Sequence, residues 1–313
     1  MGVNYPNFMI LANGVDVSLK LKKENHTITF KDEANEKADE LSIEVGGEFA
    51  RPKYKDELKL YLGYGEALTF CGLFTVQTTE RTDNNVLSIS ATGVNFGSEL
   101  KEKRDITYEK VSIKDICSQI ANRGGLKLKS DFDDIYITSL AQSGESDLHF
   151  LNRLAKDYNS IFNIKNNTLI FTKKIKDDKK NDELPSYIIS EKNTSTLSIK
   201  HSNKTLYKSC KSTYHDTKTN KAVEVIAGSG KPCLVNQGSF KNEAEAMTKA
   251  KAKLDKANQG LVSGSLTIEG EIIFAGGKLV LIDTLEDDGE YQIKSVSHTF
   301  DVNGWVTSLE FEN

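Results

Sequence analysis

The residue types best suited to chemistry gather in one segment, SGESDLHFLNRLAKDYNSIFNI, at positions 143–164. A Ser, a His, an Arg and carboxylates occur there close together along the chain. This set is compatible with an active site, because nucleophilic and acid–base catalysis use these side chains in contact with one another. It is equally compatible with a helix that only packs, so the spacing of the residues has to decide.

The spacing favours the packing helix. Ser146 is placed to cap the helix, and Asp147 suits the positive end of the helix dipole. Asp147 and Arg153 are six residues apart, so they project from poorly matched faces. His149 falls beside the apolar stripe, near its polar edge. The stripe is formed by Phe150, Leu151, Leu154, Ala155 and Tyr158.

The enzyme motifs fail elsewhere in the chain. GSGK at 228–231 resembles a phosphate-binding loop, but Val225 and Pro232 occupy the places of a required Gly and a required Ser or Thr. We interpret it as a turn between strands. The sequence has no G-x-S-x-G, H-E-x-x-H or G-x-G-x-x-G, and none of its five histidines has a second ligand at metal spacing. We predict no catalytic residue, no cofactor and no metal.

Runs of acidic residues keep a hydrolase open as an alternative. Asp133-Asp134 or Glu286-Asp287-Asp288 would have to supply two carboxyls that face each other across a cleft. Adjacent acids in a polar loop point in different directions and stay solvated, which argues against that role. The alternative is a β-rich cell-wall hydrolase acting on peptidoglycan or polysaccharide, or a carbohydrate-binding module. The lone Trp305 argues against the module, which needs a cluster of exposed aromatics.

Composition sets further limits. A length of 313 residues predicts two or three domains. The net charge is −4. Because contacts to nucleic-acid phosphates require a basic surface, this charge argues against a protein whose main role is to bind nucleic acid. We expect no Sec-type signal peptide and no membrane anchor, because the start lacks a basic and then apolar pattern and no apolar run is long enough. The four scattered cysteines predict buried thiols in a reducing compartment.

The first hundred residues predict β structure with one buried face. Period-2 alternation bounded by Gly and Asn indicates strands at 41–45, 58–62, 70–76 and 86–93. Near the start, the segments 8–11 and 28–30 together with a turn at Asn13-Gly14 predict a hairpin.

The middle of the chain changes character. Ser112 is placed to cap a helix with Asp115 at the third helical position, and Gly124 fits the position just after its end. The segment 143–164 supplies a second helix. The segments 161–164 and 168–172, joined by a turn at Asn166-Asn167, predict a hairpin, so this region is expected to form a compact α/β unit.

The last part of the chain returns to strands. The charged segment 173–185 is expected to be a solvated linker or loop. A long helix is predicted over 239–258, with Glu residues early and Lys residues late, as the helix dipole favours.

A pattern in the first part of the chain recurs near the end. L-K-L-Y-L (58–62) leads to G-L-F-T-V (72–76), and K-L-V-L-I (278–282) leads to G-E-Y-Q-I (289–293). We interpret this as a duplicated β-barrel that is split by the α/β unit. The predicted domains are 1–100, a first β-barrel; 101–175, an α/β insert; and 176–313, a second β-barrel with the long helix.

The ordered motifs resemble the late control protein D family, the baseplate hub of contractile phage tails, and more faintly the hub part of type VI secretion spike proteins. Gln142 followed by E-S-D-L-x-F-L-x-R-L-A (145–155) resembles the central helix of the family. G-S-L-T-I-E-G (264–270), D-G-E-Y-Q-I-K-S-V-S-H-T-F (288–300) and G-W-V-T-S-L (304–309) resemble its C-terminal barrel. The resemblance covers almost the full chain and is weakest at 177–235.

The resemblance implies a structural protein without catalysis. Hubs of this family are ring-shaped trimers in which each subunit contributes two similar barrels, so the ring joins a hexameric tail tube to a trimeric central spike. Implied partners are the tail spike protein, the tail tube or tube-initiator protein, other baseplate proteins, and the tape-measure protein and DNA that pass through the channel. The expected location is the baseplate of a virion or tail-like particle, after synthesis in the bacterial cytoplasm.

The resemblance also marks structural residues without assigning an interface. These are Ser146, Asp147, Phe150, Leu151, Leu154, Gly289, Tyr291 and His298. Some members of the family carry a fused lysozyme or peptidase domain, and none is expected here because Asn313 follows the last predicted strand.

Overall fold

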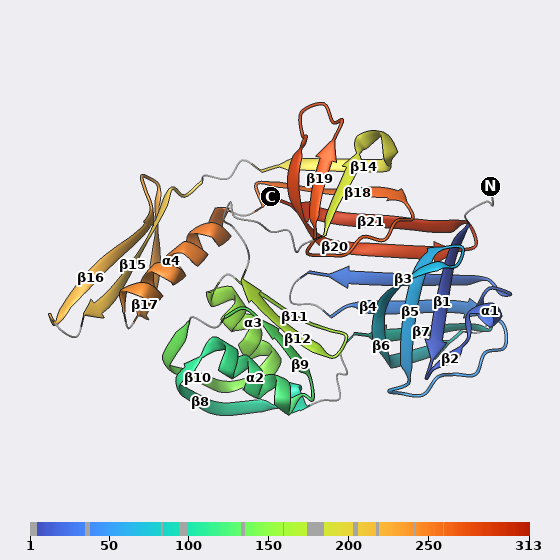
Figure 1. Cartoon of the computed structure of the whole chain (residues 1–313), viewed down its shortest axis with the longest axis horizontal. Helices are drawn as coiled ribbons and strands as arrows, with labels where there is room; N and C mark the ends of the chain where they lie inside the picture. Colours follow the sequence, from blue (N-terminus) through green and yellow to red (C-terminus); the bar gives the residue numbers. More distant parts are fainter. Residues whose placement is uncertain are drawn as a thin grey trace.

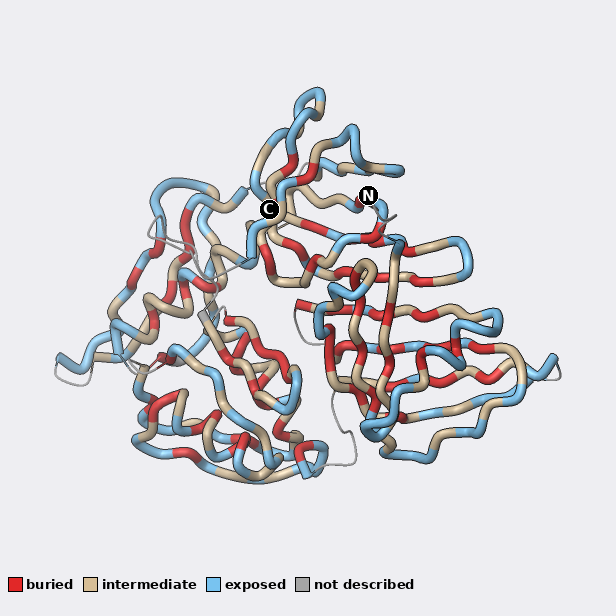
Figure 2. Tube along the Cα trace, turned by 45° about the vertical axis from the view of Figure 1, so that its right-hand side comes forward, coloured by how far each residue is buried: buried red, intermediate tan, exposed pale blue. Residues whose placement is uncertain are grey.

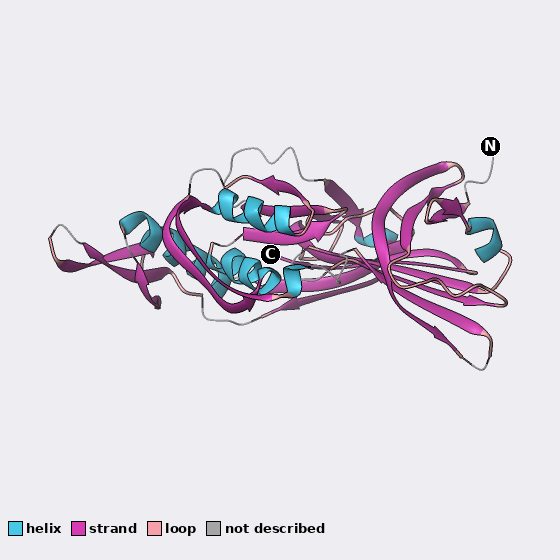
Figure 3. Ribbon diagram, turned by 90° about the horizontal axis from the view of Figure 1, so that it is seen from below, coloured by secondary structure: helices cyan, strands magenta, loops and turns pink. Residues whose placement is uncertain are grey.

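The computed structural model describes residues 5–313, except 35–37, 83, 94–98, 133–134, 159, 174–184, 203–205, 217–218, 241 and 259. Strands extend through the whole molecule, whereas most of the helical ribbon lies away from the N-terminus (Figure 3). The predicted mainly β fold is therefore confirmed. The predicted linker at 173–185 falls mostly outside the described residues.

Six strands near the N-terminus enclose the first core, and we call them the first half. They are β1 (Pro6–Ala12), β3 (His26–Glu33), β4 (Glu40–Gly46), β5 (Glu57–Tyr64), β6 (Ala67–Arg81) and β7 (Val86–Thr92). Neighbours in the sheet follow the order β1-β5-β6-β7-β4-β3. Buried and exposed residues alternate along these strands (Figure 2), so their apolar faces meet in one cluster that includes Ile10, Leu41 and Leu60. The four strands predicted by alternation coincide with β4 to β7, except that β7 ends at Thr92, one residue before the predicted end.

Six strands near the C-terminus repeat this arrangement, and we call them the second half. They are β13 (Ser186–Ser190), β14 (Thr194–His201), β18 (Val262–Glu269), β19 (Lys278–Ile282), β20 (Gly289–Asp301) and β21 (Gly304–Glu312). Their order is β13-β19-β20-β21-β18-β14. When the strands of each half are numbered along the chain, both halves therefore have the same spatial order: first, fourth, fifth, sixth, third, second. One pair differs in direction, because β13 and β19 are parallel whereas β1 and β5 are antiparallel.

The two halves join in one sheet, because β3 also pairs with β20. Among the described residues, the resulting thirteen-stranded sheet follows an open path, so its ladders do not form the two closed barrels that the sequence predicts. The first half curls through side-chain packing instead. The Phe8 ring on β1 meets the Phe300 ring on β20 edge to face, with centroids 5.0 Å apart. Twist bends a sheet back on itself, but only a further ladder would close it.

The predicted hairpin at the N-terminus is wrong in its second strand. Asn13 and Gly14 form a turn with φ of 48° and 85°, but the chain returns into the short β2 (Val15–Asp16), which precedes α1 (Ser18–Leu21). The segment 28–30 lies in β3, and β1 pairs with β5 along its whole length. A turn signal specifies the local reversal, whereas the partner of a strand depends on the apolar face that it shares with distant residues.

Residues 99–173, which we call the insert, form a core of their own. Its elements are η1 (Glu99–Lys101), β8 (Lys103–Ser112), α2 (Ile113–Arg123), β9 (Lys127–Ser130), β10 (Tyr136–Ser146), α3 (Asp147–Asp157), β11 (Ser160–Lys165) and β12 (Thr168–Lys173). The stripes of α2 and α3 are buried in one cluster with side chains of β11 and β12. The predicted hairpin of β11 and β12 is confirmed, and Asn166 and Asn167 at its turn have φ of 49° and 57°.

The caps of α2 are close to the prediction. The Ser112 side chain accepts from the Asp115 N–H while the Asp115 carboxylate accepts from the Ser112 N–H, which completes the capping box. At the other end Gly124 keeps a right-handed conformation. The left-handed residue is Gly125, with φ of 63°, one position later than predicted.

A small separate unit follows β14. β15 (Ser209–Asp216), β16 (Lys221–Gly228) and β17 (Cys233–Phe240) form a three-stranded sheet that packs against α4 (Glu243–Asn258) (Figure 1). The predicted helix thus begins at Glu243 rather than at 239, because Phe240 still belongs to β17. The Asn242 side chain accepts from the Glu245 N–H at 2.8 Å and so starts the helix.

Candidate functional site

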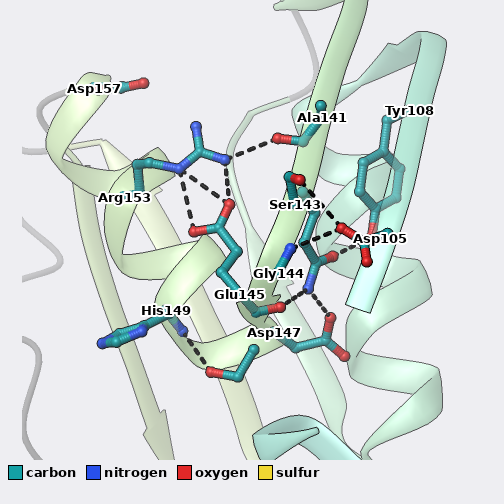
Figure 4. Close-up of polar contacts among 12 residues, drawn as sticks. Asp105, Tyr108, Ala141, Ser143, Gly144, Glu145, Asp147, His149, Arg153 and Asp157 are labelled. Carbon is teal, nitrogen blue, oxygen red and sulfur yellow. Dashed lines mark hydrogen bonds and ion pairs between the residues drawn. The ribbon is translucent and has the colours of Figure 1, made fainter. Parts of the chain in front are cut away.

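The candidate segment begins in β10 and continues into α3, so its polar residues lie where strand and helix meet (Figure 4). Asp147, in the first turn of α3, is fully buried. Its carboxylate accepts hydrogen bonds from Arg123 Nε at 3.0 Å, from Arg123 Nη2 at 2.9 Å and from Gln142 Nε2 at 2.9 Å. A bidentate guanidinium compensates a buried carboxylate that would otherwise be costly.

Arg123 extends this network to a second strand. Its Nη2 also donates to the Tyr108 hydroxyl at 3.1 Å, and Arg104 Nε lies 3.8 Å from the Asp147 carboxylate. The hydrogen bonds that Arg123 donates to Asp147 raise the pKa of Arg123 above its ordinary value, so the guanidinium stays charged. The network therefore fixes α3 to α2, β8 and β10.

Arg153 and Ser146 of the segment also have hydrogen-bond partners. Arg153 Nε donates to Glu145 Oε1 at 3.2 Å, and Arg153 Nη2 donates to the Ala141 carbonyl at 2.9 Å. The hydrogen bonds that Arg153 donates to Glu145 raise the pKa of Arg153. The Ser146 Oγ accepts from the His149 N–H at 3.3 Å as the predicted cap, and the His149 side chain is exposed.

This arrangement does not assemble a catalytic group. The Ser146 hydroxyl is directed to the backbone of α3, and the Asp147 carboxylate is held by Arg123 rather than by a histidine. A nucleophile needs a base within hydrogen-bond reach, and that base needs an orienting partner. Three further residues of the segment are fully buried in the core of the insert: Phe150, Leu151 and Leu154. The geometry thus favours a packing helix with a buried polar anchor.

The three remaining motif residues lie on β20, in another part of the fold (Figure 1). Gly289 begins the strand opposite Leu281. Tyr291 donates from its hydroxyl to the Asp287 carbonyl at 2.9 Å. His298 is buried, with Nε2 2.9 Å from the Ile273 carbonyl. Because a carbonyl can only accept, Nε2 carries the proton, and burial lowers the pKa of His298 so that the ring is neutral.

A second polar cluster lies where the insert meets both halves, and the sequence interpretation missed it. Lys165 on β11 forms ion pairs with Asp32 of β3 and with Asp39, the latter at 3.3 Å. The Asp32 carboxylate also accepts from the Ala275 N–H at 2.7 Å. Asn163 donates to the Glu33 carbonyl at 2.7 Å. Period-2 alternation in β3 places Asp32 on the same buried face as the apolar residues 28 and 30. This alternation is the sequence signal that could have revealed a buried carboxylate here.

The charges of this junction are unbalanced, since one ammonium faces two carboxylates. Burial, together with the like charge of Asp32, raises the pKa of Asp39 to about 7, although Lys165 opposes this shift. The two carboxylates raise the pKa of Lys165 despite its burial, so the ammonium stays charged. The junction therefore holds one carboxyl that titrates near neutral pH.

The other predicted features take ordinary structural places. GSGK begins at Gly228, the last residue of β16, and leads toward β17, as the turn interpretation predicts. Asp133 and Asp134 fall outside the described residues, and Asp288 caps an exposed loop by accepting from the Thr284 N–H at 2.7 Å. Three thiols are buried, but Cys233 is exposed, which corrects the prediction for that residue.

The described residues contain no group of three or more His, Cys, Asp or Glu residues placed to hold a metal ion. None of their helices is both long enough and apolar enough to cross a membrane.

An open polar groove lies over the strands where the halves join. It runs across β3, β18, β20 and β21. Small hydroxyl side chains of Ser297, Ser308 and Thr267 line it, with Lys31 and Glu310 among the charged residues. Leu266, Val296 and Leu309 also line the groove, but the described residues that line it include no aromatic side chain, and it is more polar than is typical of small-molecule sites.

Two relatives match the chain over nearly its full length. A probable baseplate hub protein of Escherichia phage 186 is 26% identical across 98% of this chain and 92% of its own length. A probable baseplate hub protein of Escherichia phage P2 is 24% identical across 98% and 93%. No family model matches the chain. The matches confirm the predicted resemblance to baseplate hub proteins of phages.

Solved structures share the fold. A 43 kDa tail protein of prophage MuSo2 from Shewanella oneidensis has a TM-score of 0.70 at 15% identity and covers 98% of both chains. A tail protein from Neisseria meningitidis has a TM-score of 0.74 at 11% identity and covers 99% of this chain and 97% of its own. An E. coli component of the type VI secretion system has a TM-score of 0.62 at 9% identity and covers 96% and 76%.

Proposed function

We propose that the chain is the baseplate hub protein of a contractile phage tail or a phage-tail-like particle. The observation that carries this proposal is the match to two probable hub proteins across 98% of the chain. A match that leaves almost no part of the chain unaccounted for supports the function of the whole protein rather than of one domain.

In this role the chain forms a ring-shaped trimer. The two halves, which share one strand order, would each supply a barrel-like unit, so three chains present six similar units around a channel. One face of the ring would then suit a hexameric tail tube and the other a trimeric spike. The repeated strand order supports this proposal because it gives the two halves similar arrangements of strands.

The remaining parts have places in the same scheme. The insert and the unit of β15–β17 with α4 project from the large sheet and would meet other baseplate proteins. The polar groove across β3, β18, β20 and β21 would face the channel, through which the tape-measure protein and DNA pass. Its hydroxyl side chains offer neither a basic wall that retains DNA nor an apolar surface that retains polypeptide.

The proposed role needs no catalysis. The residues that first suggested an active site serve as a cap, an ion-pair anchor and core packing. Trp305 is buried against other aromatic rings and is not an exposed platform for a sugar. We therefore place the protein in the baseplate of the particle, after synthesis in the bacterial cytoplasm.

Mass photometry of the purified chain tests the proposal. We expect the mass of a trimer, either for the chain alone or after addition of its cognate spike protein. A peptidoglycan digestion assay on the same preparation is expected to show no cleavage. A chain that stays monomeric with its spike and cleaves peptidoglycan would contradict the proposal.

A further inference from the structure

We propose that residues 77–81 of β6 pair with the outer edge of β14 in a second copy of this chain. This inference rests on the proposed function and names the strands through which the trimer closes. The inference follows from the shared strand order of the two halves. One half pairs with the other within the chain, and the equivalent strand edges that stay free are expected to pair in the same way between chains.

The two halves correspond residue by residue at the fifth strand. In the first half the Lys55 N–H donates to the Val76 carbonyl at 3.1 Å, and the Val76 N–H donates to the Asp56 carbonyl at 2.9 Å. In the second half Gly276 and Gly277 make the same two bonds with Ile293, at 2.9 and 3.0 Å.

Two further features fix the same correspondence. Lys55 and Gly276, which occupy the same place in the two loops, both have positive φ, at 73° and 83°. The ladder of β6 with β7 shifts register between Val76 and Thr78, and the ladder of β20 with β21 shifts between Ile293 and Ser295. Val76 therefore corresponds to Ile293, and Thr78 to Ser295.

Within the chain, the fifth strand of one half binds the second strand of the other. The first part of β20 pairs with β19, and its continuation, residues 295–301, pairs with residues 27–33 of β3. The opposite edge of β20 is taken by β21. The fifth strand thus extends past its own fourth strand and offers the free edge to a neighbouring half.

The equivalent edges of the other two strands have no strand partner among the described residues. β5 pairs with β6 only as far as Thr75, and β7 lies on the other edge of β6. β14 pairs with β18 on one edge only. Side-chain contacts along residues 77–81 of β6 include a long one from the exposed Arg51 to the Thr79 carbonyl, at 3.4 Å, and one from Arg81 to the Phe49 carbonyl, and neither is a strand ladder. An unblocked strand edge is a template for pairing with another chain.

The register of the new pairing follows from the ladders. Thr78 and Ser295 correspond on the fifth strands. Two strands away in the register of its own half, Thr78 leads to Ser42 of β4 and Ser295 leads to Ser265 of β18, so these two serines also correspond. They lie opposite Thr29 of β3 and Ser198 of β14. Lys31 therefore corresponds to Lys200.

This register brings opposite charges together. Within the chain Lys31 lies opposite Ser297, and Ser297 corresponds to Glu80 of β6. Between chains Glu80 would therefore lie opposite Lys200, and both residues are exposed in the single chain. Opposite charges at facing positions stabilise a strand pair, whereas like charges destabilise it.

The same rule closes the assembly. Every half uses its fifth strand to bind the second strand of the next half, once within a chain (β20 with β3) and once between chains (β6 with β14). Such a head-to-tail contact forms a ring when its rotation closes. Figure 1 shows β14 and β6 on opposite sides of the joined sheet, as a link in a ring requires.

Two chains with one introduced cysteine each test the register. One chain carries Glu80→Cys and the other Lys200→Cys, with different tags and with Cys233→Ser in both to remove the exposed native thiol. Facing residues on antiparallel strands have Cα atoms about 4.5–5.5 Å apart, which a disulfide can span. We expect mild oxidation of the co-expressed chains to give a covalent dimer that contains both tags.

The control replaces Glu80→Cys with Glu44→Cys, an equally exposed residue on β4 in the interior of the sheet, and should give no such dimer. Mass photometry on the same samples separates the two proposals. A trimer without the cross-link overturns this interface and leaves the hub function standing. Absence of a trimer under every condition, including addition of the spike, overturns both.

Charge reversal supplies a second measurement. Glu80→Lys places like charges opposite each other and should shift the assembly toward monomer at a fixed concentration. Glu80→Lys combined with Lys200→Glu restores the opposite pair and should restore the trimer. A single variant that assembles like the unmodified chain would count against the register.

Discussion

At the scale of single residues, Asp147 illustrates how a carboxylate can be central to structure without being central to chemistry. It is buried at the start of α3 and accepts three hydrogen bonds, two of them from one guanidinium. A reactive carboxylate needs room for a substrate, whereas this one has its lone pairs occupied by Arg123 and Gln142. Its removal would leave Arg123 Nε without its acceptor and would take one acceptor each from Arg123 Nη2 and Gln142 Nε2.

Asp147→Ala is therefore expected to lower the free energy of unfolding by about 1.5–3 kcal/mol, the range for hydrogen bonds to charged groups. The neighbouring His149→Ala is the matched control. Its side chain is exposed, so its effect should stay within about 0.5 kcal/mol. Urea denaturation of both variants measures the difference, and equal stabilities would contradict the anchor role of Asp147.

At the scale of elements, α3 is positioned by its buried stripe as well as by its polar anchor. Phe150, Leu151 and Leu154 are fully buried and pack in one cluster with the stripe of α2. The Tyr108 ring stacks on Phe150 with centroids 5.5 Å apart. Periodicity alone predicts both stripes, because the side chains of a helix return to the same face every three to four residues.

Leu154→Ala should destabilise the chain by about 2–5 kcal/mol, the cost of a cavity in a well-packed core. Thermal unfolding followed by circular dichroism would measure it. Leu154→Met, which nearly conserves volume, should cost less than about 1.5 kcal/mol. A Leu154→Ala variant as stable as the unmodified chain would mean that α3 does not pack as described.

At the scale of the whole molecule, one buried junction connects three parts of the chain. Asp32 comes from the first half, Lys165 from the insert and the Ala275 N–H from the second half. Asp39 adds a second carboxylate to the same ammonium. Because these groups meet only when all three parts are in place, their ionisation reports on the relative placement of the parts.

The raised pKa of Asp39 predicts a dependence of stability on pH. The folded chain binds this proton up to about pH 7, whereas the unfolded chain loses it near 3.8. The folded state therefore binds more protons between these values, and the Asp39 contribution to stability is lost as pH rises through this window. One proton corresponds to a slope of at most about 1.4 kcal/mol per pH unit.

Asp39→Asn cannot titrate and should flatten the stability curve between about pH 4 and pH 7 relative to the unmodified chain. Denaturant unfolding at several pH values measures the two slopes. Glu48→Gln is a control for an exposed carboxylate and should leave the slope unchanged. Parallel curves for Asp39→Asn and the unmodified chain would show that Asp39 titrates at an ordinary pKa.

The sequence predicted elements well where their signals are local. Such local signals predicted the strands with period-2 alternation, the Ser112 and Ser146 caps and the turn at Asn166-Asn167. Each depends on residues within a few positions of one another, and all are present. The interpretation of the segment 143–164 as a packing helix rests on the same kind of local signal and stays a prediction. The hairpin of 8–11 with 28–30 failed because strand pairing involves residues far apart in the chain.

The mainly β class, the two helices of the insert, the recurrence of a strand pattern at both ends and the resemblance to phage hub proteins could all be read from the sequence. The single open sheet that both ends share, the contact of Asp147 with Arg123, and the contacts of Lys165 with Asp32 and Asp39 became visible in the folded chain. The physical reason is that local preferences follow from neighbouring residues. Contacts between charges 24 and 133 positions apart depend on how the whole chain packs.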